Sequence, residues 1–419
     1  MFQIFTIRSW QARTRRTTVS VSGCLCGLVI AGNASASSPP ECRSSQAVTI
    51  PVQIISNLPF MQGRVNGSRS LSVILDTGAA LTIVSPEVAN EVDLKSAKSV
   101  QAGGFGKGSD QTLHLVNSAA LAWGSADTEL RLSNEQIAVL PIDYIGAQVG
   151  RLTDALFGSN VFQHFRVALD YERQKVSFAS FDEPCTPNAQ AIPIDIVGNA
   201  PVVDAEIASR DGTLVKARFL VDIGTTGAAI LSKQFLAAHP EVLAGRSLVA
   251  SPPFSAVGGK IESKLVRLSR LRFGGYDLDE PVAVIPEQAS GLLANPQLAG
   301  LLGGEILNRF TVTWDYRSRR MWLVPNSRLN DPFRSDASGL HLIAKGPGLS
   351  QVYVDAVLPG SPASRAGVRA GDRVISINNK PRRLWQMVRD LTLAGSTATF
   401  ALRRDGKLLR LTVLLEKLI

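Results

Sequence analysis

The chain is poor in the residues that build metal centres and nucleotide sites. Its 419 residues include only 4 cysteines and 4 histidines, and aromatic residues make up 6%. None of the histidines has metal-ligand spacing with Cys, Asp or Glu. No glycine-rich loop leads into a Lys-Ser/Thr or dinucleotide-binding pattern. We therefore expect no metal site and no cofactor. The histidines are His114, His164, His239 and His341.

The apolar stretch near the N-terminus is too short to span a bilayer comfortably. It runs from Val19 to Gly32, has only basic charges before it, and ends in Ala34-Ser35-Ala36. This order of basic, apolar and small residues predicts a signal peptide over 1–36, cleaved after Ala36. We expect export to a bacterial periplasm or secretion, with membrane attachment only if the segment stays uncleaved. The basic residues are Arg8, Arg13, Arg15 and Arg16.

Export changes the interpretation of the charge and of the cysteines. Loss of the segment's four arginines lowers the formal net charge from +9 to +5, an unexceptional value. The basic clusters Arg317–Arg320 and Arg403-Arg404 lie at predicted strand turns, so solvated hairpin tips are favoured over nucleic-acid contacts. Cys24 and Cys26 leave with the segment. The remaining pair, Cys42 and Cys185, is expected to form one disulfide.

The middle of the chain is an internal repeat. Phe165 matches Phe310 and Tyr171 matches Tyr316, both with an offset of 145 residues. Each copy contains many short alternating apolar stretches separated by turn residues, which predicts a mainly β lobe. A lobe of about 145 residues can bury close to 70% of its unfolded surface, enough for its own core.

Each copy carries an aspartate-glycine motif directly after an apolar stretch. Asp76-Thr77-Gly78-Ala79 follows Leu71–Leu75, and Asp222-Ile223-Gly224-Thr225 follows Phe219–Val221. A buried carboxylate at a strand end destabilises the fold, so we expect one there only where it has a function. The motifs resemble those of aspartic peptidases of the pepsin and retropepsin kind. In that family each lobe supplies such a loop, and the two aspartates share one water.

This resemblance implies two homologous β lobes that form a cleft, with Asp76 and Asp222 as the catalytic pair. Two adjacent carboxylates cannot both ionise readily, so the pair holds one proton. The ionised member takes a proton from the attacking water, and the protonated member stabilises the oxyanion of a peptide substrate. The residues expected to support the pair are Thr77, whose hydroxyl bonds across to the other lobe, Gly78, Gly224 and Thr225.

A second apolar element in each copy ends in glycine. Leu156-Phe157-Gly158 and Leu301-Leu302-Gly303 resemble the strand that passes under the aspartate loop in this family. Glycine at that place allows two backbones to cross closely.

The sequence departs from the family pattern at Ile223, where Thr or Ser is expected. Isoleucine has no hydroxyl, so half of the network that links the two loops is missing or replaced. Two interpretations stay open: a diverged aspartic endopeptidase, and a catalytically impaired peptide-binding or regulatory protein of the periplasm. The hairpins expected to cover the cleft contain Gly103, Gly104 and Phe105 in one copy and Gly258 and Gly259 in the other.

From Ser338 onward the pattern changes. Gly360-Ser361-Pro362-Ala363, Ala366-Gly367 and Gly371-Asp372 strongly resemble a bacterial PDZ domain over about 338–415. A helix is predicted near 383–393. The resemblance implies that the domain binds a C-terminal peptide by strand addition, with the peptide carboxylate on the loop Gly339-Leu340-His341-Leu342. A PDZ domain that merely packs on the second lobe is the alternative.

The predicted organisation is mainly β, with two pepsin/retropepsin-like lobes followed by the PDZ domain. The predicted bounds are 1–36 for the signal peptide, 37–185 for lobe 1, 186–328 for lobe 2, 329–337 for a linker and 338–419 for the PDZ domain.

Overall fold

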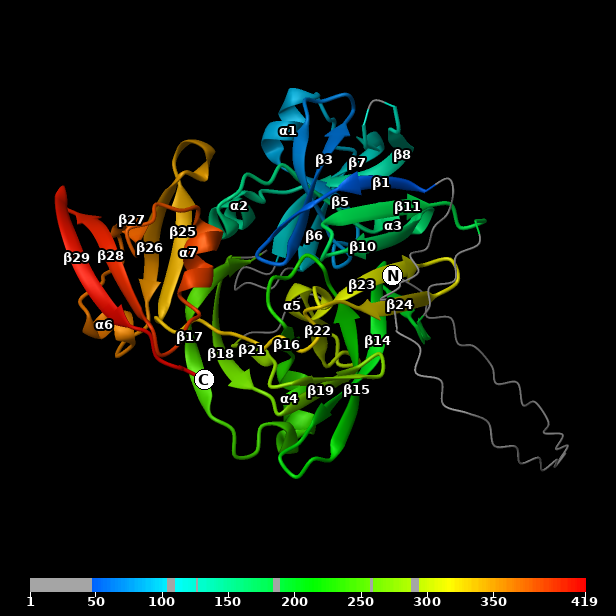
Figure 1. The fold of residues 1–419 in the computed structure, drawn as a ribbon. Helices are drawn as coiled ribbons and strands as arrows, with labels where there is room; N and C mark the ends of the chain where they lie inside the picture. Colours follow the sequence, from blue (N-terminus) through cyan, green and yellow to red (C-terminus); the bar gives the residue numbers. More distant parts are fainter. Residues whose placement is uncertain (1–46, 104–109, 126, 184–188, 257–258, 288–293) are drawn as a thin grey trace, which may run out of the picture. The chain divides into compact units, whose positions relative to one another are not determined.

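The computed structural model describes residues 47–419 apart from 104–109, 126, 184–188, 257–258 and 288–293 (Figure 1). The predicted signal peptide, the Cys42–Cys185 disulfide and the hairpin residues Gly104, Phe105 and Gly258 lie outside the described residues and stay predictions.

The fold is mainly β, as the sequence predicted. The helices are short and lie between strands. No helix in the described part of the chain is both long and apolar enough to cross a membrane. The helices that the structure describes outside the PDZ domain are α1 (Pro86–Glu91), α2 (Asp143–Val149), α3 (Ser159–His164), α4 (Lys233–Ala238), the 3-10 turn η1 (Pro240–Val242) and α5 (Gly304–Leu307).

Lobe 1 is an eight-stranded sheet in which the strand before Asp76 is central. Parallel pairing joins β4 to β9, and antiparallel pairing joins β9 to β5. Every residue of β9 is buried, and four of the five residues of β4 are buried. The strands, in sheet order, are β2 (Gln53–Ile55), β3 (Leu58–Val65), β4 (Leu71–Leu75), β9 (Ala155–Phe157), β5 (Thr82–Val84), β8 (Leu130–Val139), β7 (Asp110–Trp123) and β6 (Lys98–Gly103).

Lobe 2 repeats this arrangement around the strand before Asp222. β15 pairs in parallel with β22, and β22 pairs antiparallel with β16. The same order of pairings in both lobes is what an internal duplication predicts. The strands, in sheet order, are β17 (Leu248–Ala256), β18 (Gly259–Arg267), β21 (Val282–Pro286), β16 (Ala229–Leu231), β22 (Gly300–Leu302), β15 (Leu214–Val221), β14 (Ala200–Ala208), β19 (Arg270–Phe273) and β20 (Tyr276–Asp279), with β13 (Asp195–Val197) pairing β14.

A third sheet contains strands from both lobes. Its central pair is β10 and β23, aligned antiparallel with Val167 opposite Trp314. The Arg166 guanidinium crosses this pair to the Asp315 carboxylate, with 3.1 Å between Nε and Oδ2, and both side chains are buried. A shared sheet with a buried ion pair fixes how the lobes face each other. The strands, in order, are β1 (Val48–Pro51), β11 (Lys175–Ala179), β10 (Arg166–Asp170), β23 (Phe310–Asp315), β24 (Arg320–Pro325) and β12 (Ala191–Pro193).

The C-terminal region is a five-stranded sheet with its own apolar core. A helix, α7 (Leu384–Asp390), occupies the segment where the sequence predicted one. The other elements are β25 (Leu340–Lys345), η3 (Pro347–Leu349), β26 (Gln351–Val357), α6 (Pro362–Arg365), β27 (Arg373–Ile377), β28 (Thr397–Arg404) and β29 (Lys407–Leu414).

The segment predicted as a linker packs against lobe 2. The Phe333 side chain is 5% exposed, and the Arg309 guanidinium lies 3.6 Å from the centre of its ring. Arg267 donates hydrogen bonds to the Phe333 and Ile419 carbonyl oxygens at 3.1 and 3.2 Å. These contacts attach both the segment and the last residue of the sequence to lobe 2.

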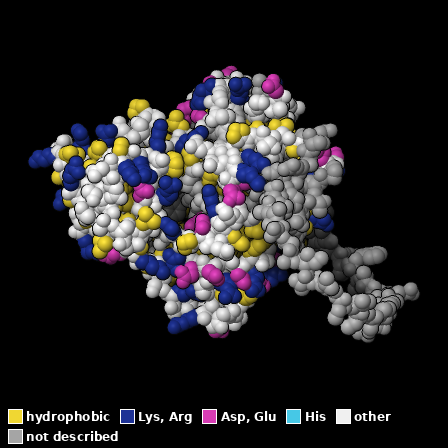
Figure 2. Space-filling view, viewed as in Figure 1, with side chains coloured by type: hydrophobic (Ala, Val, Ile, Leu, Met, Phe, Trp, Pro, Cys, Tyr) yellow, Lys and Arg dark blue, Asp and Glu magenta, His cyan; other side chains and the backbone are white. Residues whose placement is uncertain are grey.

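Arg404 lies at the turn between β28 and β29, as the sequence predicted, but its guanidinium is paired rather than solvated. Its guanidinium donates to both carboxylate oxygens of Asp372, at 2.6 and 2.7 Å, and Asp372 is 1% exposed. A buried carboxylate needs such a partner. On the face drawn in Figure 2, basic side chains are spread out with acidic ones between them.

Candidate active site

Each aspartate lies where a central strand ends and a neighbouring strand passes beneath. The Asp76 N–H donates to the Phe157 carbonyl at 3.0 Å, and the Asp222 N–H donates to the Leu302 carbonyl at 2.9 Å. The glycines that follow these strands permit the crossing. A Cβ on Gly158 would lie 2.5 Å from the Leu81 carbonyl oxygen, and one on Gly303 would lie 2.4 Å from the Gly227 carbonyl oxygen.

The two aspartates meet across the lobe boundary. The position of a Cβ on Gly78 is 2.7 Å from Asp222 Oδ1, and that of a Cβ on Gly224 is 2.4 Å from Asp76 Oδ1. Each glycine therefore faces the other lobe's carboxylate, and any side chain there would collide with it. Each carboxyl group therefore lies within the electrostatic influence of the other.

Hydrogen bonds from the loops hold each carboxylate in place. Asp76 Oδ1 accepts from the N–H groups of Gly78 and Ala79 at 2.8 and 3.2 Å. Asp222 Oδ1 accepts from the Gly224 N–H at 2.7 Å, and its Oδ2 accepts from the Thr225 hydroxyl at 2.7 Å. Thr225 thus holds the second oxygen of Asp222.

Burial and mutual repulsion keep a proton on the pair. Burial, together with the charge of Asp222, holds the pKa of Asp76 well above its usual value. Burial also raises the pKa of Asp222, although hydrogen bonds from Thr225 and Gly224 oppose the shift. Each aspartate has two donors, but those of Asp222 reach both of its oxygens, whereas those of Asp76 both reach Oδ1. The arrangement therefore favours the proton on Asp76.

Thr77 links the two loops. Its hydroxyl donates to the Val221 carbonyl at 2.8 Å and accepts from the Ile223 N–H at 3.1 Å, and the residue is fully buried. Ile223 is also fully buried, among the apolar side chains of the core. The connection is therefore asymmetric: lobe 1 contributes a hydroxyl to the backbone of lobe 2, and lobe 2 contributes only an apolar side chain.

Three tyrosines lie near the pair, and no sequence motif marked them as part of the site. The pKa of Tyr171 and that of Tyr316 are raised by burial and by the charge of the aspartates. Their hydroxyl oxygens are buried and have no hydrogen-bond partner among the described residues. Tyr144, on α2, is closer to the surface, and its pKa is raised by burial and by the charge of Asp76.

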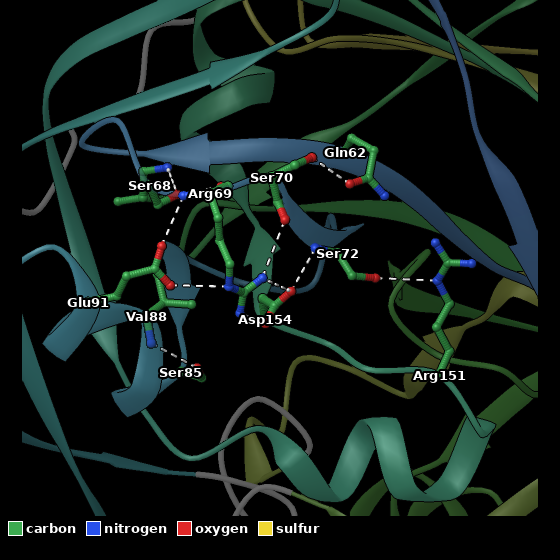
Figure 3. Close-up of polar contacts among 11 residues, drawn as sticks. Gln62, Ser68, Arg69, Ser70, Ser72, Ser85, Val88, Glu91, Arg151 and Asp154 are labelled. Carbon is green, nitrogen blue, oxygen red and sulfur yellow. Dashed lines mark hydrogen bonds and ion pairs between the residues drawn. The ribbon is translucent and has the colours of Figure 1, made fainter. Parts of the chain in front are cut away.

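A polar network secures the far end of the strand that leads to Asp76 (Figure 3). Arg69 binds both oxygens of Asp154 at 2.7 and 3.2 Å and contacts Glu91 on α1 at 3.1 Å. Asp154 in turn accepts from the Ser72 N–H at 2.8 Å. The network joins β4, α1 and the residue before β9, but no motif distinguishes Asp154 in the sequence.

The predicted hairpin residues that the structure describes lie at strand ends. Gly103 ends β6, and Gly259 begins β18 with φ +110 and no atom near its Cβ position. The tip of each hairpin lies outside the described residues. No cluster of metal-binding side chains occurs in the part of the chain that the structure describes.

In and beside the predicted carboxylate loop of the C-terminal domain, backbone N–H groups already have a hydrogen-bond partner within the domain. Gly339 has φ +79, and its N–H and that of Ser338 donate to the Asp336 carboxylate at 2.5 and 3.1 Å. Leu340 and Leu342 are buried on β25. His341 Nδ1 lies 3.2 Å from Asp355 Oδ2, and burial lowers the pKa of His341 despite this partner.

Comparison with protein families agrees with these features. Residues 61–161 match the aspartyl protease family model, and residues 353–399 match the PDZ domain model. The chain contains an aspartyl protease-like domain and a PDZ domain. The aspartyl protease match covers the loop of Asp76 but not that of Asp222, so the second half of the candidate site rests on the duplicated topology.

The likeness to individual proteins is limited. Human Rhophilin-1 is 31% identical over 105 residues, which cover 24% of this chain and 15% of Rhophilin-1. An aspartic proteinase from Irpex lacteus is 16% identical, with a TM-score of 0.42, over 68% of this chain and 99% of that one. The HtrA3 PDZ domain bound to a phage-derived ligand is 25% identical, with a TM-score of 0.18, over 20% of this chain and 86% of that one. The fold assignment therefore rests on the strand topology and the family models.

Proposed function

We propose that the protein is an aspartic endopeptidase that uses Asp76 and Asp222 to activate a water against a peptide bond. The observation that carries this proposal is the reciprocal contact of Gly78 with Asp222 and of Gly224 with Asp76. A loop without side chains at these points lets two acids approach despite their repulsion. Such an approach is useful for general acid–base chemistry and unfavourable otherwise.

The hydrogen bonds assign complementary roles to the two acids. Asp222, with donors on both oxygens, is the better candidate for the ionised base that takes a proton from water. Asp76, whose pKa is raised most clearly, is the candidate acid that hydrogen-bonds the peptide carbonyl and stabilises its developing charge. The proton that Asp222 takes from the water then passes to the leaving amine, which restores the starting protonation of the pair.

A proteolysis assay tests this proposal. Purified protein should cleave unfolded casein at some pH between about 3 and 8, and Asp76→Asn or Asp222→Asn should each lower the rate by at least a hundredfold, the lower range for losing a positioned acid or base. Asp204→Asn is the control, because Asp204 is an exposed partner of Lys216 on another strand. Cleavage that persists in both dyad variants refutes the proposal.

One observation favours a second function, a peptide-binding or regulatory protein with impaired catalysis. Ile223 supplies no hydroxyl to the contact between the loops, so of the two residues that follow the aspartates only Thr77 makes a side-chain hydrogen bond to the other loop. This second function predicts that a pepstatin-like peptide binds without turnover and that Ile223→Thr gains activity. Rapid cleavage by the unmodified protein excludes it.

We further propose that the protein is exported and that its PDZ domain docks the C-terminus of a substrate or partner. The basic, apolar and small-residue order of 1–36 supports export. The β25 strand at the end of its sheet supports docking by strand addition. Cell fractionation of a tagged chain tests export: recovery of the uncleaved form in the cytoplasm contradicts it.

A further inference from the structure

The PDZ sheet ends in two edge strands, β25 and β29, and β25 is the edge that adjoins α7 and begins with the predicted carboxylate loop. Among the described strands β25 ends the sheet and pairs only with β26, and α7 contacts β25. These two elements contribute buried apolar side chains, Leu340 and Leu342 from β25 and Leu384 and Met387 from α7. A peptide added to the edge of β25 would lie against them.

In this structure the lobe 1 helix α2 lies against both of these elements. It contacts β25 and α7 (Figure 1). Trp385 of α7 packs against a lobe 1 cluster that includes Ile142 and Val149, at the two ends of α2. Space at the contact is tight, because a Cβ on Gly150 would lie 2.7 Å from Leu384 Cβ.

The lobe 2 hairpin contacts the same domain. β17 contacts β25 and β26, and Lys260 at the start of β18 lies 3.5 Å from Asp355, the partner of His341. The hairpin contact therefore reaches the predicted carboxylate loop, whose first N–H groups are held by Asp336. Both lobes thus contact the PDZ domain on the side where a ligand would bind.

We propose that helix α2 and strand β17 hold the peptide-binding edge of the PDZ domain closed, and that a peptide with a free apolar C-terminus binds there by displacing α2. This inference rests on the proposed peptide-binding role of the PDZ domain. It does not depend on peptidase activity. The apparent affinity of the peptide is then its intrinsic affinity reduced by the fraction of molecules in which the edge is open.

Gly150→Asn disturbs the contact between α2 and the PDZ domain without changing any residue of the PDZ domain. Gly150 ends α2 with φ +73, a conformation that asparagine tolerates, and the three atoms nearest to its Cβ position all belong to Leu384. The substitution therefore acts on docking while the PDZ sequence stays unchanged. Gly67→Asn is the matched control, because Gly67 has φ +74 and no atom within 4 Å of its Cβ position.

The experiment measures fluorescence polarisation of a labelled decapeptide ending in a free valine carboxylate. Gly150→Asn should bind it at least tenfold more tightly than the unmodified protein, and Gly67→Asn should not differ from the unmodified protein. The same peptide with an amidated C-terminus should bind to none of them. In the unmodified protein, saturating peptide should increase amide hydrogen exchange in 143–149. Mass spectrometry verifies that the peptide stays intact.

Equal affinity in all three proteins, or unchanged exchange in α2 at saturation, overturns the inference while leaving the PDZ domain as a peptide binder. Binding to none of them overturns both the inference and the docking role, whatever the peptidase assay gives. If Gly150→Asn fails to fold, Lys260→Glu provides the second test and should also tighten binding. Its control is Lys264→Glu, since Lys264 pairs with Glu287 within lobe 2.

Discussion

Replacing Thr77 by valine tests whether a single hydroxyl holds the two aspartate loops together. Valine keeps the shape of threonine but removes the group that donates to the Val221 carbonyl and accepts from the Ile223 N–H. Ile223 offers no hydroxyl of its own, so no equivalent bond from lobe 2 shares the loss. Thr77 is fully buried, and valine fills the same space, so the substitution removes only these two hydrogen bonds.

The expected magnitude follows from the two backbone groups that lose their partner. A buried polar group without a hydrogen bond costs about 1–3 kcal/mol. Two such groups, with partial relaxation, give about 2–4 kcal/mol of lost stability for Thr77→Val. Thr77→Ser keeps the hydroxyl and loses one methyl group, so it should lose only about 1 kcal/mol.

Urea unfolding followed by tryptophan fluorescence measures this difference. Trp314 is a suitable reporter, because it is fully buried on β23 in the sheet that both lobes share. For a slope of about 2–3 kcal/mol per molar urea, the midpoint of Thr77→Val should fall by roughly 1 M. A midpoint within about 0.2 M of the unmodified protein, or one lowered equally by Thr77→Ser, would show that the hydroxyl is not what joins the loops.

Three further predictions concern the buried groups. Folding raises the pKa of each dyad aspartate, so their contribution to stability is present at low pH and is lost as the pH rises through the folded pKa. Asp76→Asn should weaken this loss of stability, measured as urea midpoints between about pH 4 and 8. Parallel pH profiles for the variant and the unmodified protein would contradict the prediction. Gly158→Ala places a Cβ 2.5 Å from the Leu81 carbonyl oxygen and should lower stability by about 1–3 kcal/mol. Gly227→Ala is the control and should be nearly neutral, because no atom lies within 4 Å of its Cβ position. Equal effects of the two substitutions in calorimetry would argue against a close backbone crossing at Gly158. Arg166→Met leaves the buried charge of Asp315 without its partner and should lower stability by about 3–5 kcal/mol in the same urea assay. The double variant Arg166→Met/Asp315→Asn should recover part of this stability. No recovery would mean that the loss comes from packing and not from the unpaired charge.

Local sequence patterns predicted the elements whose form depends on near neighbours. Apolar alternation and turn residues indicated mainly β lobes, and the 145-residue offset indicated that the strand order of one lobe would recur in the other. The glycine after each apolar element predicted a close backbone crossing, because only a residue without Cβ fits there. The helix near 383–393 followed from the PDZ resemblance.

Contacts between segments far apart in the chain left no such pattern. Asp154, Tyr144 and Arg404 look like ordinary surface residues in the sequence. Two of them have partners in other elements, Arg69 for Asp154 and Asp372 for Arg404. The charge of Asp76 contributes to the raised pKa of Tyr144. The guanidinium of Arg404 is therefore paired, which its place at a hairpin turn did not indicate.

The sequence by itself determined which side chains are present for the chemistry: two aspartates, the glycines beside them, one threonine, and an isoleucine in place of a second hydroxyl residue. Only the tertiary structure decided that each glycine faces the opposite aspartate, that one hydroxyl links the loops, and that α2 lies on the PDZ edge. The physical reason is the distance along the chain over which each kind of interaction acts. Backbone preferences and apolar periodicity act over a few residues, whereas charge, burial and steric fit depend on whichever segments the folded sheets bring together.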